Sequence, residues 1–257
     1  MENVLYEVKD RICFLTLNRP EKKNALNAAM VTELKSTFSR AEADDKVKVI
    51  ILRASGDVFC SGADLESLQQ LQGNSFDENL KDSNHLKELF LQIYQLKKLV
   101  IAQVQGHALA GGCGLATVCD FVFAVPEAKM GYTEVRIGFV PAIVMVFLLR
   151  KVGEQKGKQL LLSGKLVTGE DLVQIGLVNK LATHNNLSQE VIEFAQQLIN
   201  SNSSQSMETT KQMISEVQSM SLLEGLDYAA SMNAKARGSV DCKKGIAAFM
   251  NKEKLSW

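Results

Sequence analysis

Residues 99–125 read LVIAQVQGHALAGGCGLATVCDFVFAV, and this stretch decides the fold. Its first six residues and its last seven are apolar runs of the length expected for strands buried in a sheet. Between them, Gly106 and the pair Gly111–Gly112 mark turns, and 112–118 has the length of a short helix. A strand, a glycine-rich loop, a helix and a second strand in this order indicate an α/β protein.

The same alternation extends outward through the first 190 residues. Further strands are expected at 4–8, 12–17 and 47–52, with helices around 30–38 and 85–97. No internal repeat is visible. After about residue 190 the strand-like runs end, and helical patterns cover 189–200, 206–219, 221–236 and 239–252. We therefore expect a core of residues 1–190 and a C-terminal helical region of residues 191–257.

Composition narrows the possible functions. The 257 residues carry 29 Lys and Arg against 29 Asp and Glu, so the net charge is zero, which argues against a nucleic-acid-coating role. The five cysteines form no CxxC pair, so buried thiols in a reducing compartment are expected rather than a disulfide framework or a zinc ribbon. The N-terminal stretch MENVLYEVKD shows no signal peptide, and no run is long enough to span a membrane. These features predict a cytoplasmic protein.

Several common catalytic signatures are missing. The three histidines (His85, His107 and His184) do not have metal-ligand spacing, and the chain contains neither a GxSxG elbow nor a phosphate-binding GxxxxGK[ST] loop. We expect no metal site and no hydride cofactor. The candidates that remain are glycine-rich backbone and carboxylates.

Two loops and one carboxylate stand out. Loops 60–65 (CSGADL) and 110–114 (AGGCG) each follow a strand, and the second opens a helix whose first N–H groups are free. Two such N–H groups aimed at one point would form an oxyanion hole; alternatively, both loops are close-packed turns. Glu134 lies in the mostly apolar stretch 130–142, which suits a general acid/base with a raised pKa. The alternative is a surface acid paired with Arg136.

Four ordered motifs resemble the crotonase superfamily, the enoyl-CoA hydratase/isomerase family. They are LNRPEKKNAL (17–26), FCSGADL (59–65), QGHALAGGC (105–113) and GIAAF (245–249). The resemblance spans nearly the whole chain. It implies a spiral ββα core and a C-terminal helical trimerisation region, with trimers that often pair into hexamers.

The resemblance also implies a site for an acyl-CoA thioester, with coenzyme A as part of the substrate and no separate cofactor. Matching the motifs residue by residue assigns the two oxyanion-hole N–H groups to Ala63 and Gly111, and the acid/base role to Glu134. It places the following residues near CoA, the last two from a neighbouring subunit: Lys22, Lys23, Ala25, Ser61, Ala63, Asp64, Leu65, Phe249 and Lys252. The acyl pocket is expected around 89–94 and 143–147.

One position departs from the family pattern. Typical hydratases have a second catalytic glutamate three residues after the oxyanion-hole glycine, where this chain has Gly114. With Glu134 alone, a Δ3,Δ2-enoyl-CoA isomerase that shuttles one proton is an alternative. The stretches 112–116 and 133–142, however, resemble bacterial methylglutaconyl-CoA hydratases, which favours a lyase acting on a short or branched 2-enoyl-CoA. A non-catalytic acyl-CoA-binding subunit is the second alternative.

Overall fold

The computed structural model describes residues 2–257, except for the side chains of Leu65 and Leu71. A six-stranded sheet forms the centre, in the order β1-β2-β3-β5-β7-β9. Its strands are β1 (Val4–Lys9), β2 (Ile12–Leu17), β3 (Val49–Ala54), β5 (Leu99–Val104), β7 (Phe121–Ala124) and β9 (Lys180–Leu181). All neighbours are parallel apart from β1 and β2. The β5 strand coincides with the predicted 99–104.

The β1–β2 hairpin turns within the gap between the predicted strands 4–8 and 12–17. Lys9 pairs with Ile12, so the turn residues are Asp10 and Arg11, with φ angles of 50° and 66°. Two positive φ angles define a type I′ turn, whose twist matches that of the flanking strands. Because neither turn residue is glycine, the sequence does not indicate this turn type.

A second, smaller parallel sheet is formed by β4 (Val58–Cys60), β6 (His107–Leu109) and β8 (Met130–Gly131). Each of its strands directly follows a strand of the large sheet: β4 follows β3, β6 follows β5 and β8 follows β7. A helical segment comes next each time. The chain therefore winds through three successive ββα units, which is the spiral core expected from the resemblance, and the short strands of the small sheet lead into the candidate loops.

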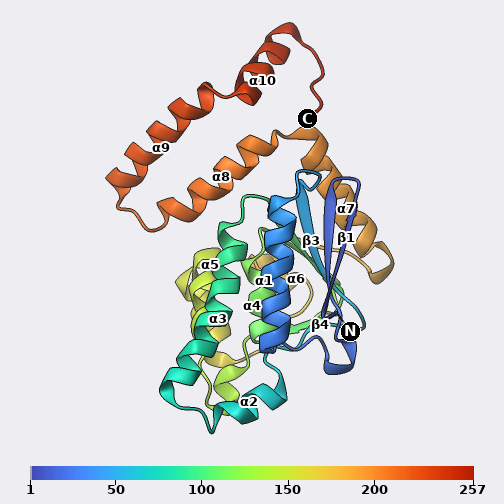
Figure 1. Ribbon diagram of the computed structural model, residues 1–257, viewed down its shortest axis with the longest axis vertical. Helices are drawn as coiled ribbons and strands as arrows, with labels where there is room; N and C mark the ends of the chain where they lie inside the picture. The colour runs from blue at the N-terminus through green and yellow to red at the C-terminus, as the bar shows by residue number, and fades with distance from the viewer. Residues whose placement is uncertain (1) are drawn as a thin grey trace.

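Helices cover the sheets (Figure 1). Their bounds are α1 (Ala28–Ala43), α2 (Leu65–Leu71), α3 (Phe76–Gln95), α4 (Gly111–Val118), α5 (Ala142–Ser163, broken at Gly153) and α6 (Glu170–Gln174), with short 3₁₀ helices η1 (Pro20–Lys22) and η2 (Glu134–Ile137). Helix α4 is almost entirely buried, since seven of its eight residues lie in the core. Across residues 2–257, no helix is both long and apolar enough to cross a membrane.

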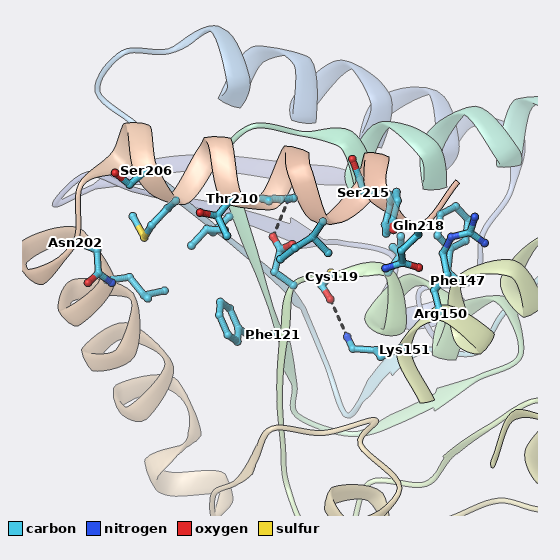
Figure 2. Close-up of a pocket in the computed structure, with 18 of the residues that line it drawn as sticks. Cys119, Phe121, Phe147, Arg150, Lys151, Asn202, Ser206, Thr210, Ser215 and Gln218 are labelled. Atoms are coloured by element: carbon cyan, nitrogen blue, oxygen red, sulfur yellow. Dashed lines mark hydrogen bonds and ion pairs between the residues drawn. The ribbon is translucent and has the colours of Figure 1, made fainter. Parts of the chain in front are cut away.

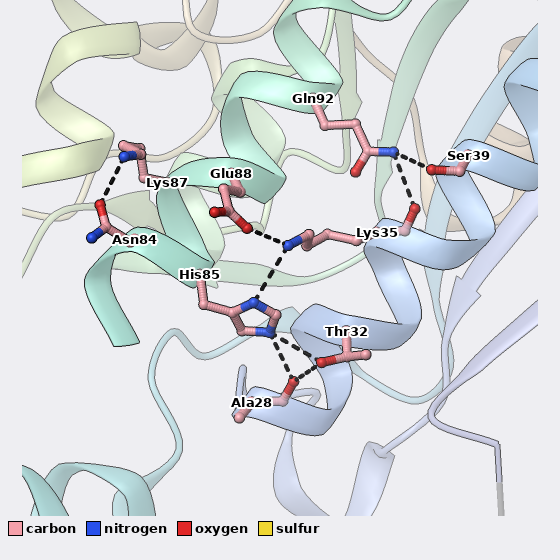
Figure 3. A network of polar contacts seen from close by, with 9 residues as sticks. All are labelled: Ala28, Thr32, Lys35, Ser39, Asn84, His85, Lys87, Glu88 and Gln92. Carbon is pink, nitrogen blue, oxygen red and sulfur yellow. Dashed lines mark hydrogen bonds and ion pairs between the residues drawn. The ribbon is translucent and has the colours of Figure 1, made fainter. Parts of the chain in front are cut away.

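Polar contacts join α1 to α3 (Figure 3). The His85 ring on α3 lies 3.0 Å from the Thr32 hydroxyl and 3.5 Å from the Lys35 ammonium, both on α1. Lys35 also forms an ion pair with Glu88, at 2.5 Å. His85 therefore has a structural role between two helices.

The C-terminal region separates into two parts. Helix α7 (His184–Ser201) packs against the large sheet and buries Leu187, Val191, Ala195, Leu198 and Ile199. Helix α8 (Ser204–Val217) lies against α3 and β5, and its buried Lys211 pairs with Asp120 (2.7 Å). Helices α9 (Leu222–Arg237) and α10 (Val240–Asn251) project from the body (Figure 1). The predicted boundary between residues 190 and 191 thus falls inside a core helix, because the apolar face of α7 belongs to the sheet.

Candidate active site

The two glycine-rich loops lie against each other. A Cβ added to Gly62 would stand 3.0 Å from the Cβ of Ala110 and from the carbonyl oxygen of Leu109, and 3.4 Å from the amide nitrogen of Gly111. Gly62 also has a φ of +93°, a conformation that favours glycine. The sequence places these loops about 50 residues apart, and the small sheet brings them together because β4 pairs with β6.

The N–H of Ala63 is available to a ligand. Residues 62–64 form a parallel bridge with Leu26, in which Leu26 donates to the carbonyl of Gly62 (2.8 Å) and Asp64 donates to the carbonyl of Leu26 (3.0 Å). Successive N–H groups along an extended segment point to opposite sides. The Ala63 N–H therefore faces away from Leu26.

The second N–H opens helix α4. Gly111 is the first helical residue, and the first N–H groups of a helix have no acceptor within it. Ala110, just before it, has φ 50° and ψ −124°, an uncommon conformation for a residue with a Cβ. The N–H of Ala110 donates to the carbonyl of Gly131 (2.8 Å), which holds the strained residue in place. Strain of this kind is concentrated at functional sites.

Glu134 has the surroundings of a general acid/base. It begins η2, and among the described residues its Oε2 is buried without a hydrogen-bond partner. Burial raises the pKa of its carboxyl group above the ordinary value. The alternative of an ion pair with Arg136 is not realised among the described residues, because Arg136 packs against Gly164 instead.

Gly114, where the family pattern has its second glutamate, is buried and tightly surrounded. Val144 of α5 and Phe90 of α3 pack directly over it. The position is therefore filled by neighbouring side chains rather than left as an empty pocket.

Five of the predicted CoA residues lie beside the two loops. Lys23 and Ser61 are joined by a backbone hydrogen bond of 3.1 Å, and Ala25 is buried next to them. Lys22 is exposed and pairs with Glu66 (2.8 Å), a contact that raises the pKa of Lys22. The Asp64 carboxylate is already engaged, since it contacts Arg19 at 3.1 Å and caps helix α2.

Two other predicted residues are not brought to the site. Phe249 on α10 is 83% exposed, and Lys252 caps the end of the same helix. Figure 1 shows α10 at the opposite end of the molecule from α2. Within one chain these two residues are thus remote from Ala63. Leu65 begins α2, and its side chain lies outside the described part of the chain.

A cavity of about 780 Å³ has a lining that does not include Glu134, Ala63 or Gly111. It opens beneath α8 and is lined by side chains from α5, α7 and α8 (Figure 2). Tyr94 and Phe147, both within the ranges expected for the acyl pocket, line it, and their tilted rings have centroids 5.3 Å apart. The centroid of Phe147 also lies 5.9 Å from that of Phe90, so aromatic rings extend from position 114 to this cavity.

Two residues at the site were not singled out from the sequence. An alanine in the sequence does not indicate a positive φ angle, so the backbone strain at Ala110 could not be predicted. Val144 fell within the predicted range 143–147, but its packing against Gly114 depends on how α5 docks on α4. The available signal was the glycine at 114, where the family pattern has a carboxylate.

Comparisons with known proteins agree with this geometry. A family model described as enoyl-CoA hydratase/isomerase matches residues 7–257. A Thermus thermophilus protein with a provisional enoyl-CoA hydratase name is 38% identical over 244 residues, covering 95% of this chain and 96% of the relative. The crotonyl-CoA hydratase of Syntrophomonas wolfei is 33% identical, covering 100% and 98%. The solved enoyl-CoA hydratase of Mycobacterium smegmatis superposes with a TM-score of 0.93 at 27% identity, covering 99% and 98%. This chain is therefore an enzyme of the enoyl-CoA hydratase/isomerase family.

Proposed function

We propose that this enzyme is a hydratase-type lyase that adds water to a short or branched 2-enoyl-CoA thioester, with 3-methylglutaconyl-CoA as a candidate substrate. The observation that carries the proposal is Glu134, a buried carboxylate with an unpartnered oxygen and a raised pKa. Two free N–H groups in neighbouring loops supply the second requirement of the chemistry. The names of relatives such as the crotonyl-CoA hydratase support the substrate class.

The N–H groups of Ala63 and Gly111 hold the thioester oxygen. Negative charge develops on this oxygen when a nucleophile adds to C3, and each donor in a dry site is worth about 3 kcal/mol. The strain at Ala110 positions the Gly111 donor before the substrate arrives.

Glu134 transfers the proton. As the oxygen of water bonds to C3, one proton of that water passes to the Glu134 carboxylate, and the C2=C3 electron pair moves onto the thioester as an enolate. Glu134 then returns the proton to C2, the enolate collapses, and the carboxylate is regenerated. A pKa raised by burial brings the group closer to neutral pH, where both transfers are efficient.

Coenzyme A would lie along the loops that precede α2. Lys22 and Lys23 reach its phosphates, with Lys22 exchanging its contact with Glu66 for a phosphate oxygen. Ala25, Ser61, Ala63, Asp64 and Leu65 contact the nucleotide through backbone atoms. Phe249 and Lys252 reach the site of a neighbouring subunit in a homotrimer or a dimer of trimers, because they are remote from their own.

Isomerisation is the second candidate, and the filled space at Gly114 favours it. Glu134 would remove a proton from C2 of a 3-enoyl-CoA, and the same N–H groups would hold the dienolate. Return of that proton to C4 moves the double bond and needs no second carboxylate.

Glu134→Gln tests the proposal. Hydration of crotonyl-CoA, followed by loss of the conjugated thioester absorbance, should fall by about 10²–10⁴-fold. Glu127→Gln, at an exposed carboxylate outside the site, should keep wild-type turnover. Undiminished turnover by Glu134→Gln would remove Glu134 from the mechanism. Wild-type protein that converts a 3-enoyl-CoA but not crotonyl-CoA would replace hydration by isomerisation.

A further inference from the structure

Residue 114 occupies a sensitive place on α4. It lies three residues after Gly111, so the two positions share one face of the helix. The family resemblance expects a catalytic carboxylate at 114, so a side chain there is expected to lie beside the acyl group whose oxygen Gly111 is proposed to hold. The atoms that fill the space at 114 therefore also determine which acid/base groups can reach the substrate.

The obstacle at position 114 is a side chain from another helix. A Cβ built on Gly114 would lie 2.2 Å from Cγ1 and 2.9 Å from Cβ of Val144, and 3.1 Å from Cε1 of Phe90. Val144 is only 4% exposed, and Phe90 is fully buried. A β-branched side chain on a helix has one strongly preferred rotamer, so moving Val144 aside is costly. Even alanine at 114 therefore requires a buried neighbour to shift.

The neighbouring glycines show that this exclusion is distinctive. A Cβ on Gly112 would meet the backbone carbonyl oxygen of Cys60 at 2.2 Å, which no substitution can remove. A Cβ on Gly111 would meet nothing closer than 3.7 Å. Of these three glycines of α4, only Gly114 has its space filled by a replaceable side chain from another helix.

We propose that Val144 is a specificity-determining residue, which limits the site to one proton-transfer group by filling the volume that a second carboxylate would need. Glycine at 114 and valine at 144 form a matched pair, so a larger residue at 114 requires a smaller one at 144. The catalytic part of this inference rests on the proposed function, whereas the steric part stands on packing alone.

A stability cycle tests the steric part. Gly114→Ala should lower Tm by roughly 2–12 °C, because it overpacks a buried helix contact. In a Val144→Gly background the same change should leave Tm unchanged or raise it, since alanine is the better helix former. Equal losses of Tm in the two backgrounds would show that Val144 is not the obstacle, whatever the reaction proves to be.

A comparison of hydration rates between variants tests the catalytic part of the inference. In Gly114→Glu/Val144→Gly, the introduced carboxylate can take the proton from water while Glu134 donates its own to C2. Hydration of crotonyl-CoA should exceed that of the isosteric Gly114→Gln/Val144→Gly control by about 10²-fold. Gly114→Glu alone should show no such gain. Equal hydration by the two double variants would overturn the specificity role, and loss of activity in Glu134→Gln remains a separate test of the proposed function.

Discussion

Positions 134 and 114 are the two places where the family resemblance expects an acid/base carboxylate, and their surroundings are opposite. At 134 the carboxylate is retained although burial leaves one oxygen without a partner and raises its pKa. At 114 the side chain is gone, and Val144 and Phe90 fill the space. The protein therefore keeps an unfavourable group at one position and a well-packed apolar contact at the other. The proposal of a site with a single proton-transfer group rests on this difference.

The largest expected effect in this comparison concerns the enolate oxygen. If Glu134 performs every proton transfer, no second acid is present to stabilise the enolate oxygen when a backbone N–H donor is lost. Ala63→Pro removes the N–H and should lower kcat/KM by about 10²–10³-fold. Ala63→Gly keeps the N–H and is the matched control. Similar kinetics for both variants would show that Ala63 does not hold the substrate.

A smaller effect concerns stability at position 134. Because burial raises the pKa of Glu134 in the folded protein, the folded state holds this proton more tightly than the unfolded chain. The resulting stabilisation is present below the ordinary value of 4.5 and is lost as the pH rises through the folded-state pKa. Glu134→Gln, which stays neutral, should thus have a higher Tm than wild type at pH 8.

Tm measured for both proteins across pH 4–8 decides this point. The advantage of the glutamine variant should shrink as the pH falls and should disappear at the acid end of the range. A difference in Tm that is independent of pH would mean that the ionised carboxylate is well stabilised in the fold. The contrast between positions 134 and 114 would then lose its energetic basis.

Long helices and strands with a clear hydrophobic pattern could be predicted from the sequence. Short strands, and contacts that depend on how helices pack together, could not. The apolar run 99–104 is β5, and the patterns after residue 206 correspond to α8, α9 and α10. The strands of the small sheet have two or three residues each, too few to show a period, so the three ββα units were visible only through the family resemblance.

The candidate site divides in the same way. Glu134 and the two loops could be recognised from residue type and spacing, and the fold brings the loops into contact. The strain at Ala110 and the packing of Val144 on Gly114 could not, because both arise from tertiary docking rather than local pattern. The positions of Phe249 and Lys252 relative to a neighbouring subunit remain predictions.

The most direct test of the central claim is exchange of the C2 proton of butyryl-CoA in D2O, followed by NMR. This saturated thioester cannot be hydrated or isomerised, so exchange reports only enolate formation and proton transfer by Glu134. Wild-type protein should catalyse the exchange, and Glu134→Gln should reduce it by about 10²-fold or more. Exchange at the wild-type rate in Glu134→Gln would contradict the claim that Glu134 is the proton-transfer group of this site.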